Sequence, residues 1–293
     1  MKQLRPVIFL WVAAWIVISC GVSKYSVNAV YPEVDESLDY DGILEECMHD
    51  CSVKGPAQRR MYVYLPGDYY GNDERYPVLY LLHGARGNEL SWITKGNLLG
   101  NIDSLASSSM MKETIVVLPN VNQYNDDRDF GKSRLKGAIE SLFETDGMVE
   151  AAFMNDVVAT VDSIYRTIPD KEHRAIAGLS IGAMQSMYIS ANAPDSFAYV
   201  GLFSSMIHPF LRKSEYSSFY KGLKSKLKLQ FQSPPQLYSI MIGRTDIYYS
   251  RMKSFSRYLE RKEYPFVMHI TSGGHQWYNW EAFANIFMQQ LWK

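Results

Sequence analysis

The sequence predicts an α/β fold in which helices cover both faces of a mainly parallel sheet. Short apolar runs typical of buried strands alternate with longer segments whose apolar residues recur at helical spacing. A glycine-flanked serine stands at one strand-to-helix junction, and an aspartate and a histidine follow two later strands. Such alternation specifies parallel strands joined by helical crossovers. With 293 residues, 47% of them hydrophobic, the chain is long enough for one large domain of this class.

The predicted strands are short and apolar, and the predicted helices carry an apolar stripe. The strands cover residues 61–66, 77–82, 114–118, 175–177, 198–203, 237–242 and 266–270. The helices cover residues 148–166, 181–193, 248–262 and 278–291. A further segment, residues 221–228, mixes lysines with leucines at helical spacing, which favours a solvated helix face over a membrane or polyanion surface. The net charge is −1 and the lysines and arginines are scattered, so the sequence has no basic patch of the kind that binds nucleic acid.

The N-terminal segment is predicted to export and anchor the protein. Lys2 and Arg5 precede an uncharged apolar run that is typical of a signal peptide. This run is short for a spanning helix, which needs about 20 apolar residues, and Cys20 follows it in a pattern that resembles the bacterial lipobox. An uncleaved anchor or a plain signal peptide is the alternative. The expected division is a signal peptide at 1–19, a lipid on Cys20, a polar tether over 20–41 and a domain over 42–293. The expected location is the bacterial cell envelope, on its periplasmic face or at the cell surface.

Two further cysteines, Cys47 and Cys51, raise the questions of a disulfide and of a metal site. Export permits a disulfide, but on a continuous strand the two Cα atoms would lie about 13 Å apart, whereas a bridge tolerates about 7 Å. A bridge would therefore need a turn at residues 48–50. With His49 the two cysteines offer three soft ligands, but no second Cys/His pair follows, so no metal is expected.

Ser180 is the candidate nucleophile. It lies in the pentapeptide Gly178-Leu179-Ser180-Ile181-Gly182, a G-x-S-x-G between a predicted strand and a predicted helix, which is typical of the nucleophile elbow of serine hydrolases. The glycines allow a sharp turn that exposes the hydroxyl in front of a helix N-terminus. In isolation the pattern could be an ordinary turn, so partners are required.

The candidate acid and base follow later strands, where a parallel sheet places functional groups. Asp246 follows the strand at 237–242, and His275 follows the strand at 266–270 after two glycines. The order serine, aspartate, histidine is that of α/β-hydrolases. His275 could instead be a buried structural histidine, and Asp246 could simply cap the next helix. Weaker substitutes for Asp246 are Asp195 and Glu281.

The candidate oxyanion hole begins with the glycine-rich turn His83-Gly84-Ala85-Arg86-Gly87, directly after the strand at 77–82. Such a turn can aim a backbone N–H at the elbow, and we assign the two donors to Ala85 and Ile181. The alternative is a tight strand-to-helix turn without a catalytic role.

The stretch from Tyr80 to Trp92 resembles the H-G-x-x-G-x-E-x-x-W signature of the esterase D-like family, which includes the feruloyl and acetylxylan esterases of carbohydrate esterase family 1. The similarity runs from about residue 52 to the C-terminus. It includes residues 62–66, 165–167, 175–180 and 273–277 and Trp280. Two positions depart from the usual pattern, Ala183 after the elbow and Gln276 after the histidine, and neither removes a catalytic group.

The resemblance implies an α/β-hydrolase with an eight- or nine-stranded sheet that cleaves esters without a cofactor. The expected substrate is a feruloyl or acetyl ester of a plant polysaccharide such as xylan, and the expected partners are that polysaccharide and a membrane reached through the lipid. Aromatic faces suit a sugar ring or a cinnamoyl group; the expected substrate-binding residues are Trp92, Trp277, Trp280 and Arg86. For the tryptophans the alternative is core packing. Two other functions remain open: hydrolysis of siderophore trilactones or other small esters, and noncatalytic glycan binding by a degenerate hydrolase.

Overall fold

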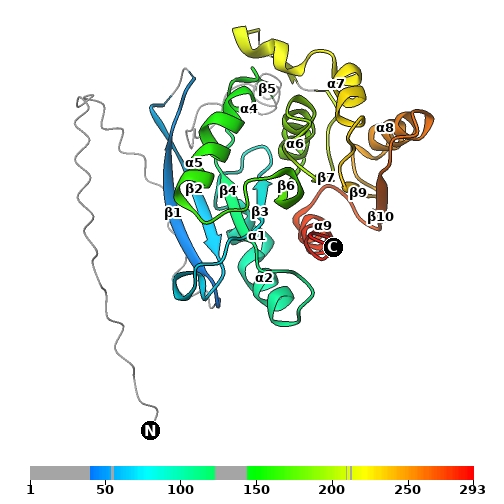
Figure 1. Ribbon diagram of the computed structural model, residues 1–293. Helices are drawn as coiled ribbons and strands as arrows, with labels where there is room; N and C mark the ends of the chain where they lie inside the picture. The colour runs from blue at the N-terminus through cyan, green and yellow to red at the C-terminus, as the bar shows by residue number, and fades with distance from the viewer. Residues whose placement is uncertain (1–39, 54–55, 123–143, 209, 212) are drawn as a thin grey trace, which may run out of the picture. The chain divides into compact units, whose positions relative to one another are not determined.

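The computed structural model describes residues 40–53, 56–122, 144–208, 210–211 and 213–293 (Figure 1). Every described residue belongs to one compact unit of the chain. The predicted signal peptide, Cys20 and nearly all of the tether therefore lie outside the described residues. Within the described ranges, no helix is long and apolar enough to cross a membrane.

An eight-stranded sheet forms the centre of the domain, in the order β1-β2-β4-β3-β6-β7-β9-β10. Its strands are β1 (Ile43–Asp50), β2 (Gln58–Leu65), β3 (Val78–Leu82), β4 (Ile115–Pro119), β6 (Arg174–Leu179), β7 (Tyr199–Phe203), β9 (Leu237–Gly243) and β10 (Val267–Thr271). β1 pairs with β2 and β2 with β4 antiparallel, and the remaining neighbours are parallel. A second sheet consists of β5 (Glu144–Thr145) and β8 (Phe210–Leu211). The predicted mainly parallel sheet is confirmed.

Helices cover both faces of the large sheet (Figure 1). One face packs against α4 (Met148–Phe153), α5 (Ala159–Ile164), α6 (Ile181–Asn192), α7 (Leu223–Gln230) and α8 (Tyr249–Arg261). The other packs against α1 (Ser91–Gly96), α2 (Leu98–Ser107) and α9 (Trp277–Met288). Alternation along β3 explains the two cores: Tyr80 belongs to the first, whereas Leu79 and Leu81 belong to the second. Because both faces are covered, every residue of β3, β6 and β7 is buried.

Three features of the fold differ from the sequence prediction. β1 was not predicted, because it lies at the edge of the sheet and half of its residues are polar. α1 and α2, which follow the oxyanion turn, were not predicted either. The predicted helix at 148–166 contains one π-helical turn, Met154–Val158, between α4 and α5. This wider turn brings Asp156 and Val157 into the buried face together.

The first described residues already contact the domain that was predicted for 42–293. The ring of Tyr40 packs against that of Tyr64 at 6.4 Å, and the Asp41 N–H donates to the Asp103 carboxylate at 2.6 Å. Farther along, Cys47 and Cys51 are both free thiols. Cys47 lies in β1 and Cys51 directly follows its end, which fits the extended spacing that disfavours a bridge.

Candidate active site

Ser180 stands at the sharp turn between β6 and α6. Its backbone angles are φ 55° and ψ −113°, which L-residues rarely adopt. The conformation is held from both sides, because the Ser180 N–H donates to the Phe203 carbonyl on β7 at 2.8 Å and its own carbonyl accepts from Met184 at 3.2 Å. The strain therefore lies at the position that the pentapeptide predicts for the nucleophile.

Gly182 lets the elbow and the oxyanion turn touch through their backbones. A Cβ on Gly182 would overlap the carbonyl oxygen of His83, whereas a Cβ on Gly84 would meet the end of the Leu179 side chain. At position 182 only glycine permits this approach without a shift of the backbone. The candidate nucleophile and the candidate oxyanion donors consequently belong to one rigid assembly.

His275 and Asp246 reach Ser180 from the loops that follow β10 and β9. His275 Nε2 lies 3.0 Å from Ser180 Oγ, and His275 Nδ1 lies 3.0 Å from Asp246 Oδ2. The Asp246 side chain is fully buried, whereas that of His275 is 21% exposed. The three predicted residues thus form one hydrogen-bonded row whose serine end faces the pocket. Such a row can move a proton from the hydroxyl to the imidazole.

Asp246 is held in its ionised form. Burial disfavours the charge, but hydrogen bonds from His275 and from the Tyr248 N–H outweigh it and hold the pKa of the Asp246 carboxyl below its usual value. The bond from the Tyr248 N–H closes a short turn before α8, whose N-cap is Tyr248 itself, so Asp246 is not the helix cap that the sequence allowed as an alternative. Oδ1 accepts from the backbone, while Oδ2 faces the imidazole.

Two aromatic rings fix the orientation of the imidazole. The Tyr248 ring lies edge-on to His275 with centroids 5.2 Å apart, and Trp280 lies edge-on at 4.9 Å. Both rings leave the ring nitrogens free to face Asp246 and Ser180. Trp280 therefore supports the base as well as lining the pocket.

The candidate oxyanion donors lie where the sequence predicts them. Ile181 is the first residue of α6, so its N–H has no partner inside the helix. Ala85 lies in the turn closed by the bond from Gly87 N to Gly84 O at 3.0 Å, next to Arg86 with φ 59°. Within the described part of the chain neither amide donates a hydrogen bond. Both are available for an oxygen that gains negative charge.

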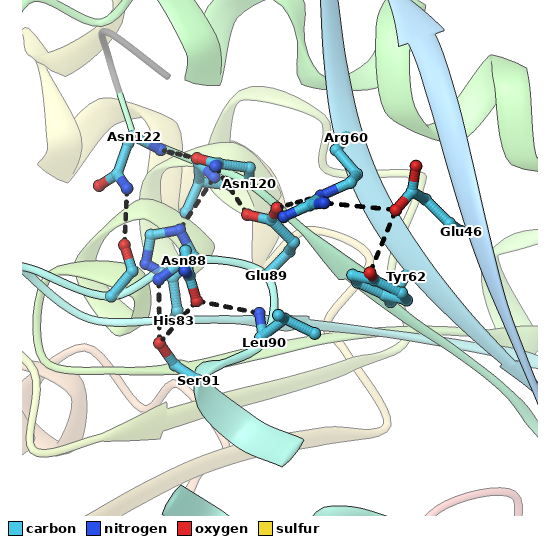
Figure 2. A network of polar contacts seen from close by, with 12 residues as sticks. Glu46, Arg60, Tyr62, His83, Asn88, Glu89, Leu90, Ser91, Asn120 and Asn122 are labelled. Atoms are coloured by element: carbon cyan, nitrogen blue, oxygen red, sulfur yellow. Dashed lines mark hydrogen bonds and ion pairs between the residues drawn. The ribbon is translucent and has the colours of Figure 1, made fainter. Parts of the chain in front are cut away.

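A buried polar network holds the oxyanion turn in place (Figure 2). Glu89 Oε1 accepts from Arg60 Nε on β2 at 2.6 Å, and Glu89 Oε2 accepts from Asn120 Nδ2, just after β4, at 2.7 Å. Asn122 Nδ2 donates to the Gly87 carbonyl at 2.6 Å. Sequence reasoning missed this role, although Glu89 is the acidic residue of the quoted signature. Its partners lie 29 and 31 residues away and only the fold brings them together.

His83 has a fixed tautomer in the same network. The Val121 N–H donates to Nε2 at 3.1 Å, so Nε2 is the acceptor and Nδ1 carries the proton that it donates to the Gly84 carbonyl at 2.8 Å. Burial lowers the pKa of His83, which agrees with a neutral ring. His83 therefore positions the turn rather than acting as a base.

The pocket in front of Ser180 has a volume of about 670 Å³ and is lined by Arg86, Lys95, Trp277 and Trp280 among others. Trp92 differs from the expectation that it binds substrate. It is 1% exposed, and its indole N–H donates to the Leu82 carbonyl at 3.1 Å. Trp92 lies behind the pocket wall, where its ring packs edge-on against Trp277 at 5.4 Å, so the core-packing alternative describes it.

A separate cluster brings His49, Cys51 and Asp156 together, with ligand atoms within 4.8 Å of one another. Arg59 places its positive charge against the same group and hydrogen-bonds to Cys51. Burial raises the pKa of the Cys51 thiol, which makes it a poor ligand in its neutral form. The neighbouring cation and the protonated thiol disfavour a metal, and we assign no metal centre there.

The chain is similar in sequence to known esterases. The sequence model of the family named Esterase matches residues 52–288. An endo-1,4-beta-xylanase/feruloyl esterase of Xylanibacter ruminicola is 36% identical over 146 residues, which are 48% of this chain and 19% of that protein. The chain thus spans a small part of this relative's length.

Solved structures share the fold. A ferulic acid esterase from Anaeromyces mucronatus is similar with a TM-score of 0.68 and 22% identity, covering 88% of this chain and 93% of the other. An S-formylglutathione hydrolase from Staphylococcus aureus is similar with a TM-score of 0.63 and 18% identity, covering 86% and 99%. The chain belongs to the esterase family and has the α/β-hydrolase fold.

Proposed function

We propose that the protein is a serine carboxylic-ester hydrolase that removes feruloyl or acetyl groups from plant polysaccharide. The row of hydrogen bonds from Ser180 through His275 to Asp246 carries this proposal. It joins a strained nucleophile, a base and a buried carboxylate at one end of a pocket open to the outside. This is the arrangement that acyl transfer requires.

The proposed reaction proceeds through an acyl-enzyme. His275 Nε2 takes the proton of Ser180 while Oγ attacks the ester carbonyl, and the new oxyanion accepts hydrogen bonds from the Ala85 and Ile181 amides. Collapse of this intermediate breaks the bond to the sugar oxygen, which receives the proton from His275. Water then attacks the acyl group with His275 again as base, and the carboxylic acid leaves while Ser180 regains its proton.

Two observations support an acylated polysaccharide as the substrate. The wall of the pocket presents Trp277 and Trp280, whose faces suit a cinnamoyl ring or a sugar. The Xylanibacter ruminicola relative is named an endo-1,4-beta-xylanase/feruloyl esterase. The pocket is open, which leaves room for a polymer on the alcohol side of the ester.

Labelling with a fluorophosphonate tests whether Ser180 is a nucleophile. The expected result is one adduct on Ser180 in the folded protein and none in Ser180→Ala. Ser163→Ala, which changes an exposed serine on α5, is the matched control and keeps the label. Absence of an adduct on the folded wild-type protein would leave noncatalytic glycan binding as the better proposal.

A substrate panel tests the ester class. The purified protein is incubated with feruloylated arabinoxylan, acetylated xylan, a catecholate trilactone and S-formylglutathione, and released acid is measured by chromatography. We expect the wild-type protein to release acid from a xylan ester. In Ser180→Ala the rate of this release should be lowered about 10⁴-fold or more. Turnover of the trilactone or the thioester alone would replace the polysaccharide with a small ester as the substrate.

We also propose that a lipid on Cys20 anchors the mature protein in the bacterial envelope. The supporting pattern is the charged start, the apolar run and Cys20 after it. Bacteria that express the full chain and are fed an alkyne-tagged fatty acid should label the wild type but not Cys20→Ala. Equal labelling of Cys20→Ala would exclude this residue as the lipid site.

A further inference from the structure

Positive charge is concentrated in one segment of this nearly neutral chain. The whole chain has 30 lysines and arginines and 31 aspartates and glutamates. Residues 221–262, which include α7 and α8, hold ten of those cations and only two carboxylates, Asp246 and Glu260. Asp246 is occupied by His275, so Glu260 is the single other counter-charge within the segment. The excess of positive charge extends over α7 and α8, which cover the same face of the sheet (Figure 1).

A cleft lies among these basic residues. It has a volume of about 1000 Å³, and both helices contribute to its walls. Its basic lining residues are His208, Lys224, Arg251 and Arg261. Its aromatic lining residues include Tyr188, Tyr220 and Tyr258. None of the described residues that line it is acidic, and none of these four basic side chains forms a salt bridge with a described carboxylate.

The lining side chains of α8 share one face of that helix. Arg251, Ser254, Phe255, Tyr258 and Arg261 recur every three or four residues. The ten steps from Arg251 to Arg261 correspond to about 15 Å along the helix axis. The cleft therefore offers a row of cations, hydroxyl groups and rings, as an extended ligand would need.

The row starts next to the catalytic base. The Arg251 guanidinium lies 5.9 Å from the centre of the Tyr248 ring, and that ring lies 5.2 Å from the ring of His275. A substrate chain whose ester is at Ser180 would have to pass over the buried Tyr248 ring to reach the cleft. Lys224 on the opposite wall faces the Tyr258 ring at 5.8 Å, so cations and aromatic faces alternate across the opening.

We propose that this cleft binds a uronate-bearing stretch of the polysaccharide whose ester is cleaved at Ser180. The inference rests on the proposed function and specifies that the polysaccharide substrate carries acidic sugars. Carboxylates suit the three cations of Lys224, Arg251 and Arg261, and a sugar face suits the half-buried ring of Tyr258, whereas Tyr188 and Tyr220 are buried and form the floor. A hollow of this kind suits a sugar chain better than a lipid surface, where basic side chains would stand on a flat or convex helix face.

Binding of sugars without an ester separates this proposal from hydrolysis. The full chain carrying Cys20→Ala is titrated calorimetrically with xylotetraose and with xylotetraose bearing one glucuronate. We expect the acidic sugar to bind about fivefold more tightly at low salt, and we expect this preference to disappear at 0.5 M sodium chloride, where the charges are screened.

Two variants with equal charge locate the effect. Lys224→Gln/Arg261→Gln should remove the preference for the acidic sugar. Arg257→Gln/Lys262→Gln should keep it, because these residues lie on the same side of the domain but outside the cleft lining. All four side chains are exposed, so both proteins should fold, which circular dichroism checks.

Equal affinity for the two sugars, or equal loss in both variants, would overturn the proposal. Binding to phosphatidylglycerol vesicles that only the cleft variant loses, with no preference between the sugars, would assign the cleft to a membrane instead. The substrate panel is an independent test. If the protein prefers the acidic sugar but releases no acid from any xylan ester, the proposal for the cleft stands and the proposed ester substrate is refuted.

Discussion

Asp246 performs two tasks with its two oxygens, and the substitution Asp246→Asn separates them. The Asn side chain can still accept from the Tyr248 N–H through its carbonyl oxygen, but its amide would face His275 with a donor and favour the wrong tautomer. We expect kcat to fall about 10⁴-fold with little change in KM. Hydrolysis of a soluble feruloyl ester measures this loss.

Asp195→Asn is the matched control, because Asp195 is the other candidate acid and its side chain is 84% exposed. It should retain wild-type kcat. A loss below tenfold in Asp246→Asn, or a comparable loss in Asp195→Asn, would contradict the assigned acid.

The pH dependence of stability follows from the same carboxyl. Because the folded protein holds the pKa of Asp246 below its usual value, its charge stabilises the fold above the ordinary aspartate pKa of about 4. That contribution is lost as pH falls through the lower folded value. The difference in unfolding free energy between wild type and Asp246→Asn should therefore be constant from pH 5 to 7 and shrink toward pH 3 in urea titrations.

Residue roles could be predicted from the sequence where they follow from position in the chain. Ser180, Asp246 and His275 each follow a strand, and parallel strands place their carboxyl ends at one edge of the sheet. Trp92 shows the limit. Its place beside the signature motif says nothing about which face of α1 it occupies, and the structure directs it into the core.

At the scale of elements, the oxyanion turn depends on a charge pair buried between β2 and the turn itself. Glu89→Gln would leave Arg60, which is 5% exposed, without its charged partner on the turn. Removing one partner of a buried pair typically costs about 3 kcal/mol. We expect that loss of stability in urea unfolding, together with a kcat lowered about tenfold or more and a nearly unchanged KM, because Ala85 loses its fixed position.

Glu46→Gln is the control for this pair. Glu46 contacts the same arginine at 3.3 Å, but its side chain is 51% exposed, so the loss should stay below about 1 kcal/mol with normal kcat. Equal effects of the two substitutions would refute a positioning role for Glu89.

Glu150 joins α4 to three other elements in a fully buried site. Its Oε1 accepts from Thr145 at 3.0 Å, from Gln185 at 2.7 Å and from Tyr220 at 2.5 Å. Burial raises the pKa of Glu150, so above the ordinary glutamate value the folded state holds a proton that the unfolded state releases. Stability from this group must therefore fall as pH rises.

Glu150→Gln tests this sign. Glutamine resembles the protonated acid and cannot ionise, so the stability of the variant relative to wild type should increase from pH 4.5 to pH 8 in urea titrations. The exposed Glu172→Gln should show no such trend. A constant difference between Glu150→Gln and wild type would mean that folding leaves the pKa of Glu150 unchanged.

Elements could be predicted where both faces of a strand are buried and the sequence is continuously apolar, as in β3, β6 and β7. β1 could not, since an edge strand exposes much of its surface and its residues are mixed. The network around Glu89 could not be predicted either, because it depends on the pairing of β2 with β4 and of β4 with β3. Residues 221–228 were predicted as a solvated helix face, and the cleft arises only when α7 and α8 lie on the same side of the sheet.

At the scale of the whole molecule, the described domain contains every group that the proposed reaction uses. The described residues form one compact unit, and its first described contacts are those of Tyr40 and Asp41. The residues before position 40 are proposed to determine only where the protein resides. Their removal should therefore leave folding and catalysis intact.

A protein of residues 40–293 tests whether the first 39 residues are dispensable for folding and catalysis. Its thermal midpoint should lie within about 2 °C of that of the full chain, since a loss of 1 kcal/mol would shift a domain of this size by about that amount. Its kcat on a soluble feruloyl ester should be unchanged, whereas partition into a detergent phase, which the lipidated chain should show, should be lost. A midpoint lowered by much more, or a lower kcat, would mean that the first 39 residues pack on the domain and support its site. Starting at residue 42 instead should lower the midpoint, because that cut removes the Tyr40 ring and the Asp41 N–H that contact Tyr64 and Asp103.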